Sequence, residues 1–406
     1  LIVTTNVQLL ESLFANRPAP CRKLHSVAQS VVYFDEAQTF PTPLVRATLE
    51  TLNALKDDYG VTIVFGTATQ PAFSSLSGVV DGGWAPREIV TDVSGAFSRM
   101  RRTRALWPAS ADERMSWDDL ATTLEPQRQA LVVVNLKKHA VALTKALCER
   151  LRPEDCGAVF HLSTALCPSH RANILTKIRE RLASGEPTFL ISTQCVEAGV
   201  DIDFPVVWRA LAPLDSIAQA FGRCNREGRL TVDAACARVF IPADDDIPML
   251  DYAQATDLVR AHFRGADLSD PAEFKRYFER LYGARDLAGQ GGRKQGTLRE
   301  AIDHLNFPTI AAEYRLIADD TVTAVVPYGD AGRKVWQSLL DAPAEAIGAR
   351  LREAQPYSIN IYRSELRKAA VREIPGDKSG ERWLWVGNYH ELFGAIAAPE
   401  GEAIVV

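Results

Sequence analysis

The chain has 406 residues, which is too long for a single core and predicts two or three domains of roughly 100–200 residues each. Its hydrophobic content of 47% and charged content of 24% are ordinary for a globular protein, and its formal net charge of -5 excludes nucleic-acid binding by bulk charge. The sequence has no run of about 20 apolar residues, so a membrane span is not expected.

The first predicted elements are two short apolar strands separated by a helix. Residues 31–34 form a β-rich run that ends at Asp35, and residues 61–65 form a second that ends at Gly66. Between them, residues 43–58 show helical spacing of leucines. This order is typical of a buried parallel sheet, in which functional residues lie where the strands end.

A second α/β unit follows an interval, 85–128, that we interpret as a connection. Its predicted strands cover 131–135, 158–161, 189–193, 206–208 and 238–241, and its predicted helices cover 138–151, 170–183 and 215–221. Beyond it, residues 250–282 are expected to be helical, and the Gly-rich segment 283–296 is expected to be mobile. The last part of the chain mixes a short helix (334–340) with β-rich pieces (358–362 and 383–386).

Asp35 and Glu36 are adjacent carboxylates at the end of the first strand. A metal-bound nucleotide needs one carboxylate to hold magnesium and another to position the attacking water. The alternative is a solvated acidic turn, but the apolar strand before the pair favours a site. Thr67 and Thr69, at the end of the next strand, could hydrogen-bond these carboxylates, although a plain turn would be the favoured interpretation if they stood alone.

The most specific pattern is Gln219-x-x-Gly222-Arg223-x-x-Arg226. On a helix, the i, i+3 spacing puts both guanidinium groups on one side. Arginine suits phosphate oxygens because its fork of donors is planar and permanently charged. The alternative is a helix face that is salt-bridged to local acids such as Glu227.

Weaker candidates stand at other predicted strand ends and near the start of the chain. After the strand at 189–193, Gly199 suits a close backbone approach, and Asp201 could accept a hydrogen bond from a ribose hydroxyl. Small donors and cations could contact nucleic-acid phosphates, although each is equally explained as a loop or as solvated surface. These residues are Thr4, Thr5, Asn6, Lys137, His161 and Thr193.

In this order, the segments resemble the motifs of superfamily 2 helicases. Residues 1–6 resemble the motif Ic region, 35–38 motif II, 66–69 motif III, 192–203 motif V and 219–226 motif VI. Segments 4–14, 35–41, 161–164 and 222–228 are more narrowly similar to the CRISPR-associated helicase–nuclease of type I systems, which the surveillance complex Cascade recruits to target DNA.

This resemblance implies an α/β fold with two RecA-like lobes built on parallel sheets, the first lobe being incomplete. The implied domains are the C-terminal part of lobe one (1–100), an inter-lobe connection (101–128), lobe two (129–245), a helical linker (246–335) and a small α+β accessory domain (336–406).

The resemblance also implies roles for individual residues. Asp35 would hold Mg²⁺ through water and Glu36 would orient the attacking water, while Arg223 and Arg226 would clamp the γ-phosphate of ATP and Gln219 would connect the lobes. The remaining nucleotide-side residues would be Gln38, where many relatives carry histidine, with Thr67, Thr69, Gly199 and Asp201. Single-stranded DNA would be held by Thr4, Thr5, Asn6, Lys137, His161 and Thr193.

Two features of the family are absent from this sequence: a Gly-Lys-Ser/Thr phosphate loop and a His-Asp dipeptide. The chain also lacks an initiating methionine. The resemblance therefore implies a C-terminal piece whose nuclease domain and phosphate loop lie elsewhere in the same protein. By itself the chain is expected to hydrolyse almost no ATP.

The seven cysteines form no Cys-x-x-Cys pair, which favours reduced thiols in the cytoplasm. Two alternatives stay open. One is another superfamily 2 motor that acts on RNA or in repair. The other is a non-catalytic lobe pair that binds nucleic acid or a protein partner.

Overall fold

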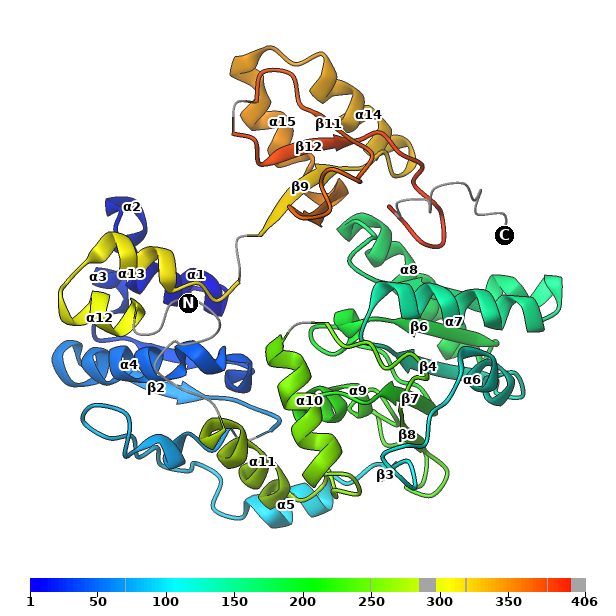
Figure 1. Cartoon of the computed structure of the whole chain (residues 1–406), viewed down its shortest axis with the longest axis horizontal. Coiled ribbons are helices and arrows are strands. Elements are labelled where there is room, and N and C mark those ends of the chain that lie inside the picture. The colour runs from blue at the N-terminus through cyan, green and yellow to red at the C-terminus, as the bar shows by residue number, and fades with distance from the viewer. Residues whose placement is uncertain (70, 249, 285–296, 318–319, 378, 396–406) are drawn as a thin grey trace. The chain divides into compact units, whose positions relative to one another are not determined.

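A computed structural model describes residues 1–406 except 70, 249, 285–296, 318–319, 378 and 396–406 (Figure 1). Most of the Gly-rich segment that is expected to be mobile, 283–296, thus lies outside the described residues. The chain divides into two compact units. The first contains Leu1–Arg101, Pro213–Ala218 and Leu250–Asp319, and the second contains Arg102–Ala212, Gln219–Met249 and Asp320–Val406. Among the described residues, no helix has both the length and the apolar character needed to cross a membrane.

The first unit contains a two-stranded parallel sheet. Strand β1 (Val31–Phe34) pairs with β2 (Thr62–Phe65) in register from Val31 opposite Thr62 to Phe34 opposite Phe65. Helix α4 (Val45–Tyr59) connects the two strands and buries Leu49, Leu52 and Leu55 on one face. The predicted strand, helix and strand are confirmed, because the leucine spacing matches the helical period.

The first unit contains further helices, most of them short. They are α1 (Asn6–Leu13), α2 (Pro18–Cys21), α3 (Leu24–Val27), α5 (Val93–Arg99), α10 (Leu250–His262), α11 (Pro271–Gly283), α12 (Thr297–Asp303) and α13 (Phe307–Glu313). The ring of Tyr314 stacks on Phe14 with centroids 3.6 Å apart, and its hydroxyl lies 2.6 Å from Thr48 Oγ1. Arg299 of α12 pairs with Glu50 of α4 at 3.2 Å. Residues 250–284 and 297–317 therefore pack with the N-terminal hundred residues.

The second unit is built on a six-stranded, all-parallel sheet. Its strands, in spatial order, are β3 (Arg104–Leu106), β8 (Cys236–Phe240), β7 (Val206–Ala210), β4 (Gln129–Val133), β6 (Thr188–Ser192) and β5 (Val159–Leu162). Helices α6 (Trp117–Leu124) and α7 (Lys137–Arg150) share one apolar core with this sheet. Helix α8 (Pro168–Ser184) continues the α/β pattern, whereas α9 (Leu214–Phe221) is divided between the two units after Ala218. Together they form a RecA-like α/β fold.

Residues 104–106 correct one expectation. The sequence places them in a connection, whereas they form the edge strand β3, paired with β8. A three-residue strand that begins with an arginine has too few apolar positions to give a recognisable alternation. Its pairing depends on residues more than a hundred positions away.

A mixed sheet forms the C-terminal part of the second unit. Its strands, in spatial order, are β10 (Ser358–Tyr362), β9 (Thr321–Val325), β12 (Arg382–Trp385) and β11 (Val371–Glu373), accompanied by α14 (Gly329–Leu340) and α15 (Ile347–Glu353). The Tyr389 hydroxyl accepts a hydrogen bond from Cys167 N at 3.1 Å and lies 3.0 Å from His170 Nδ1. Ala395 N donates to Ala165 O at 3.0 Å. The segment after β12 is thereby joined to the start of α8.

Candidate functional site

The two adjacent carboxylates lie directly after β1. Glu36 has a φ of 53°, in the left-handed region, and its backbone N–H donates to Asp35 Oδ1 at 3.2 Å. Ala37 N donates to Gly66 O at 3.3 Å, which fixes this turn to the end of β2. The Asp35 side chain is exposed and that of Glu36 is half-buried. Across the described ranges neither carboxylate forms an ion pair, so both are available to a cation.

A chain of side-chain hydrogen bonds joins the ends of β1 and β2. The buried Gln38 donates through Nε2 to Glu36 Oε2 and accepts through Oε1 from the Thr67 hydroxyl. Thr69 N in turn donates to Thr67 Oγ1 at 3.2 Å. The structure thus brings together Glu36, Gln38, Thr67 and Thr69, four of the residues chosen from the sequence.

The small donors at the start of the chain lie close to this turn. Asn6 Nδ2 donates to the backbone carbonyl of Asp35 at 3.2 Å. Thr5 caps α1, because its hydroxyl accepts from Gln8 N at 3.1 Å. Thr4 and Thr5 are exposed. The candidate nucleic-acid donors of the first unit therefore adjoin its carboxylate pair.

The two arginines of the second unit do not share a helix. Gln219 belongs to α9, but α9 ends at Phe221, and the following residues turn through Asn225, whose φ is 50°. The expectation that Arg223 and Arg226 lie on one helical face is therefore wrong. A bridge between Phe204 and Cys224 takes this segment out of the helix.

Arg223 and Arg226 instead hold the loop that follows β6. The buried Arg223 donates from Nε to Val196 O at 2.9 Å and from Nη2 to Glu197 O at 2.6 Å. Arg226 Nε pairs with Asp201 Oδ1 at 2.8 Å, on the surface. The structure therefore brings Asp201, Arg223 and Arg226 together where the loop after β6 contacts the loop after α9.

Gly199 lies in that loop with a φ of 70°. A Cβ at this position would meet no atom within 4 Å. The left-handed backbone by itself favours glycine at this position, and the expected close approach of a ligand stays a prediction.

Two candidate nucleic-acid contacts of the second unit face the interior. His161 is fully buried in β5, where its Nε2 lies 2.9 Å from Ser163 Oγ and burial lowers its pKa to about 3. Thr193 is also buried, and its hydroxyl donates to Cys195 Sγ at 3.5 Å. The expectation that these side chains contact a strand is therefore not supported by this conformation, since both are covered by protein.

Lys137, the remaining candidate of this group, is half-buried at the first position of α7. Burial lowers the pKa of Lys137, and the nearby Glu365 and Cys195 oppose that change.

Sequence reasoning missed a buried polar network beneath the same loop. Arg209, on β7, is 0% exposed; its Nη2 lies 2.9 Å from Glu197 Oε1, and its Nη1 donates to Asn135 Oδ1 at 2.7 Å. Gln194 Nε2 donates to Asn135 O at 3.2 Å. The detectable signal was an arginine inside an otherwise apolar strand, because buried charges are normally paired.

The chain is similar to known proteins in sequence and in fold. The sequence profile of the family described as "CRISPR-associated nuclease/helicase Cas3, C-terminal" matches residues 126–229. A CRISPR-associated nuclease/helicase Cas3 of Haloferax volcanii is 47% identical over 74 residues, which are 18% of this chain and 8% of that relative.

Two solved structures share the fold. The crystal structure of T. fusca Cas3-ATP aligns with a TM-score of 0.61 and 16% identity, covering 93% of this chain and 53% of that chain. A CRISPR RNA-guided surveillance complex, pre-nicking, aligns with a TM-score of 0.58 and 17% identity, covering 93% and 56%. The chain spans about half the length of these solved chains and far less of the Haloferax relative.

Proposed function

We propose that this chain is a superfamily 2 helicase of the Cas3 type and forms the ATP-dependent, single-stranded-DNA translocating part of a CRISPR type I interference helicase–nuclease, a proposal that its similarity to Cas3 proteins supports. The observation that carries the proposal is the pairing of Glu36 with Gln38 and Thr67 at the ends of β1 and β2. On this proposal the nucleotide is hydrolysed beside the carboxylate pair, which hydrogen bonds through Gln38 join to Thr67 at the end of β2. T. fusca Cas3, whose fold is shared, was solved with ATP.

Asp35 and Glu36 fit a magnesium ion. Their carboxylates are reachable from solvent, lie side by side in the chain and carry no competing lysine or arginine within the described part of the chain. Mg²⁺ prefers oxygen ligands and keeps several waters, so one or two carboxylates suffice to hold it beside a nucleotide. When bound, the ion would neutralise charge on the phosphates. Gln38 keeps the Glu36 carboxylate oriented as the acceptor for the attacking water's proton.

We propose different roles for Arg226 and Arg223. Arg226 is the more exposed and is held by a surface ion pair, so it is the residue that can turn to a γ-phosphate. Arg223 is committed to the carbonyls of Val196 and Glu197 and positions the loop that carries Gly199 and Asp201. We propose that Gln219, in the last turn of α9, connects the lobes.

We propose that single-stranded DNA is bound through Thr4, Thr5 and Asn6, with Lys137 as a half-buried cation of the second unit. Such contacts reach phosphates and carry little sequence preference. Because Asn6 donates to the carbonyl of Asp35, a strand held there would act directly on the hydrolytic turn. We place this activity in the cytoplasm, at target DNA marked by a surveillance complex such as the one that aligns with this chain.

The test is nucleotide turnover by the purified chain, with and without single-stranded DNA. Because the sequence contains no Gly-Lys-Ser/Thr loop, we expect almost no turnover from the chain alone. Addition of a companion polypeptide that carries the phosphate loop is expected to give DNA-stimulated turnover, abolished by Glu36→Gln and by Arg226→Ala.

Asp58→Asn, at an exposed carboxylate of α4, is the matched control and is expected to leave turnover unchanged. Robust turnover by the chain alone, or turnover in the mixture that is indifferent to Glu36→Gln, would refute the proposal. DNA binding that ignores both nucleotide and Arg226→Ala would favour a non-catalytic binding role.

A further inference from the structure

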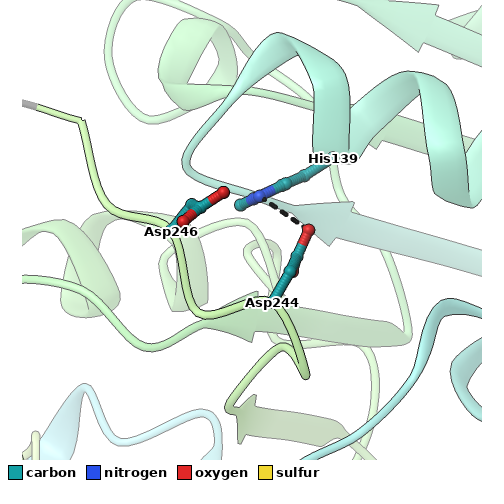
Figure 2. A group of neighbouring side chains, drawn as sticks. All are labelled: His139, Asp244 and Asp246. Atoms are coloured by element: carbon teal, nitrogen blue, oxygen red, sulfur yellow. Dashed lines mark ion pairs between the residues drawn. The ribbon is translucent and has the colours of Figure 1, made fainter.

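A histidine and two aspartates meet in the second unit, at a place to which the proposed function gives no role (Figure 2). His139 lies in the first turn of α7, and Asp244 and Asp246 lie in the loop that follows β8. One ligand atom from each of the three residues can be chosen so that all lie within 4.8 Å of one another. That spacing is small enough for one ion to contact all three.

His139 is the least expected member of this cluster. Its side chain is 1% exposed, and within the described ranges neither ring nitrogen has a hydrogen-bond partner. Its Nε2 lies 3.2 Å from Asp244 Oδ2, and the ring points toward both aspartates (Figure 2). Since buried polar groups are normally satisfied, a buried imidazole directed at two carboxylates indicates a missing partner.

The backbone around the aspartates is fixed without the help of a ligand. Ala243 N donates to Met115 O at 2.9 Å, and Asp245 N donates to Pro242 O at 3.2 Å. Asp245 has a φ of 33° and pairs with Arg114 at 3.2 Å. The side chains of Asp244 and Asp246, on either side of it in the chain, lie near His139 (Figure 2). The three ligand groups are therefore held in place by the fold.

One cation already competes for the cluster. Lys138 Nζ pairs with Asp246, whose pKa is lowered by the hydrogen bond from that lysine. Asp244 has no lysine or arginine partner among the residues described. The cluster thus carries more negative than positive charge, and a divalent ion would meet only Lys138 as a rival.

We propose that His139 Nε2, Asp244 and Asp246 bind one divalent transition-metal ion of the Mn²⁺ or Zn²⁺ class. One imidazole nitrogen with two carboxylate oxygens suits these borderline ions, whereas Mg²⁺ prefers oxygen ligands alone. The ion would fix the loop after β8 to the start of α7. Asp246 would exchange its lysine for the metal, and water would fill the remaining positions.

The experiment uses Mn²⁺, because the seven cysteines of the chain would bind Zn²⁺ adventitiously. Free Mn²⁺ is counted by its electron paramagnetic resonance signal during titration of the whole chain, and nitrogen ligation is read from pulsed-resonance modulation by ¹⁴N. We expect one bound Mn²⁺ with a ¹⁴N signal. The Asp35–Glu36 pair offers only oxygen ligands, so Mn²⁺ bound there gives no ¹⁴N signal. Failure of the proposed function would therefore not affect this result.

Substitutions test which side chains coordinate the Mn²⁺ ion. Asp244→Asn and Asp246→Asn are expected to weaken the ¹⁴N-coupled site by at least about tenfold, and His139→Gln to abolish the nitrogen signal. Asp233→Asn, an exposed acid in the same unit, is the matched control and leaves the affinity unchanged. Lys138→Met removes the competing cation and is expected to tighten binding by about threefold or more, a gain that misfolding cannot produce.

Two results would overturn the proposal. One is the absence of any ¹⁴N-coupled Mn²⁺ in the unaltered chain at concentrations up to about 1 mM, the range of weak binding. The other is a nitrogen-coupled site whose affinity is the same in Asp244→Asn, Asp246→Asn and Lys138→Met.

Discussion

The parallel sheets of the two units differ in how fully they are covered. In the second unit, all residues of β6 and four of five residues of β4 are buried, Val132 completely. In the first unit, Val31 and Tyr33 of β1 are 70% and 61% exposed. The apolar runs at 31–34 and 131–134 look alike in sequence, so the comparison teaches that an apolar strand is buried only where other elements cover both faces.

The same contrast extends to charge. Arg209 and Glu197 form their pair inside the covered sheet, where water is excluded. Arg299 and Glu50, in the first unit, form theirs with both side chains partly exposed. A charge that loses its partner is costly in the first setting and nearly harmless in the second, because solvent screens only the latter.

The largest effect is expected from Arg209→Met. It removes the guanidinium but keeps the side chain long, and it leaves the Glu197 carboxylate buried without its arginine. The free energy of unfolding of the second unit should fall by about 3–5 kcal/mol, measured by urea denaturation.

Arg299→Met is the matched control and should cost about 1 kcal/mol or less. The double variant Arg209→Met with Glu197→Gln should recover part of the loss. Equal costs for the two single variants would show that the sheets do not differ in this way.

Acid is expected to destabilise the second unit next most strongly. Burial lowers the pKa of His170 to about 4 from an ordinary 6.5. Between these values the unfolded chain binds a proton that the folded chain does not, so the free energy of unfolding falls as pH drops from 6.5 toward 4. The change is at most about 1.4 kcal/mol per pH unit for this residue.

The measurement is urea unfolding between about pH 7 and about pH 5. His170→Phe keeps an aromatic ring stacked on Tyr328 and removes the titrating group. It should therefore reduce the pH dependence, and an unchanged slope would argue against a neutral, buried His170. His161, with a pKa of about 3, adds a similar dependence to both proteins.

A moderate effect is expected where the C-terminal segment covers the second unit. Gly394 has a φ of 75°, and a Cβ there would lie 2.4 Å from Ala165 O. Gly394→Ala should therefore cost about 1–3 kcal/mol and expose the segment after β12 to proteases.

Gly348→Ala is its control, because an exposed helical glycine with open space around it should gain about 0.5–1 kcal/mol when replaced by alanine. Thermal unfolding and limited proteolysis provide the readouts. A neutral Gly394→Ala would mean that this segment does not pack closely against Ala165.

The smallest effect is expected on the exposed strand of the first unit. Val31→Thr exchanges a methyl group for a hydroxyl in solvent and should change the free energy of unfolding by about 0.5 kcal/mol or less. Val132→Thr makes the same exchange inside the covered sheet and should cost about 1–3 kcal/mol. Similar losses for both, in urea unfolding, would remove the distinction between the sheets.

Much of the fold could be predicted from the sequence. Strands with apolar runs that end in polar residues, such as 31–34 and 189–193, lie where expected, because runs of β-branched and aromatic residues favour strands. Strand β3 and the short helix α6 were missed, since three and eight residues are too few to establish a period, and β3 pairs with a strand distant in the sequence. The packing of 297–317 against the N-terminal part of the first unit also depends on distant contacts such as that of Tyr314 with Phe14.

The candidate site was predictable in its residue types but not in their orientation. Strand ends identified Asp35 and Glu36 because chemistry in α/β sheets gathers there. The burial of His161 could not be foreseen, since Phe393, a neighbour that covers it, comes from the far end of the chain. The separation of Arg223 from Arg226 depends on where α9 ends, a boundary that spacing alone does not fix.

The backbone conformation of Glu36 has a consequence for the stability of the protein. A residue with a Cβ is held at a φ of 53°, which costs roughly 1–2 kcal/mol relative to an ordinary helical or extended conformation. Glycine would relieve that strain but would forfeit the carboxylate. On the proposed function, thermal stability and hydrolytic activity therefore oppose each other at position 36, and Glu36→Gly would be expected to stabilise the chain while removing the carboxylate.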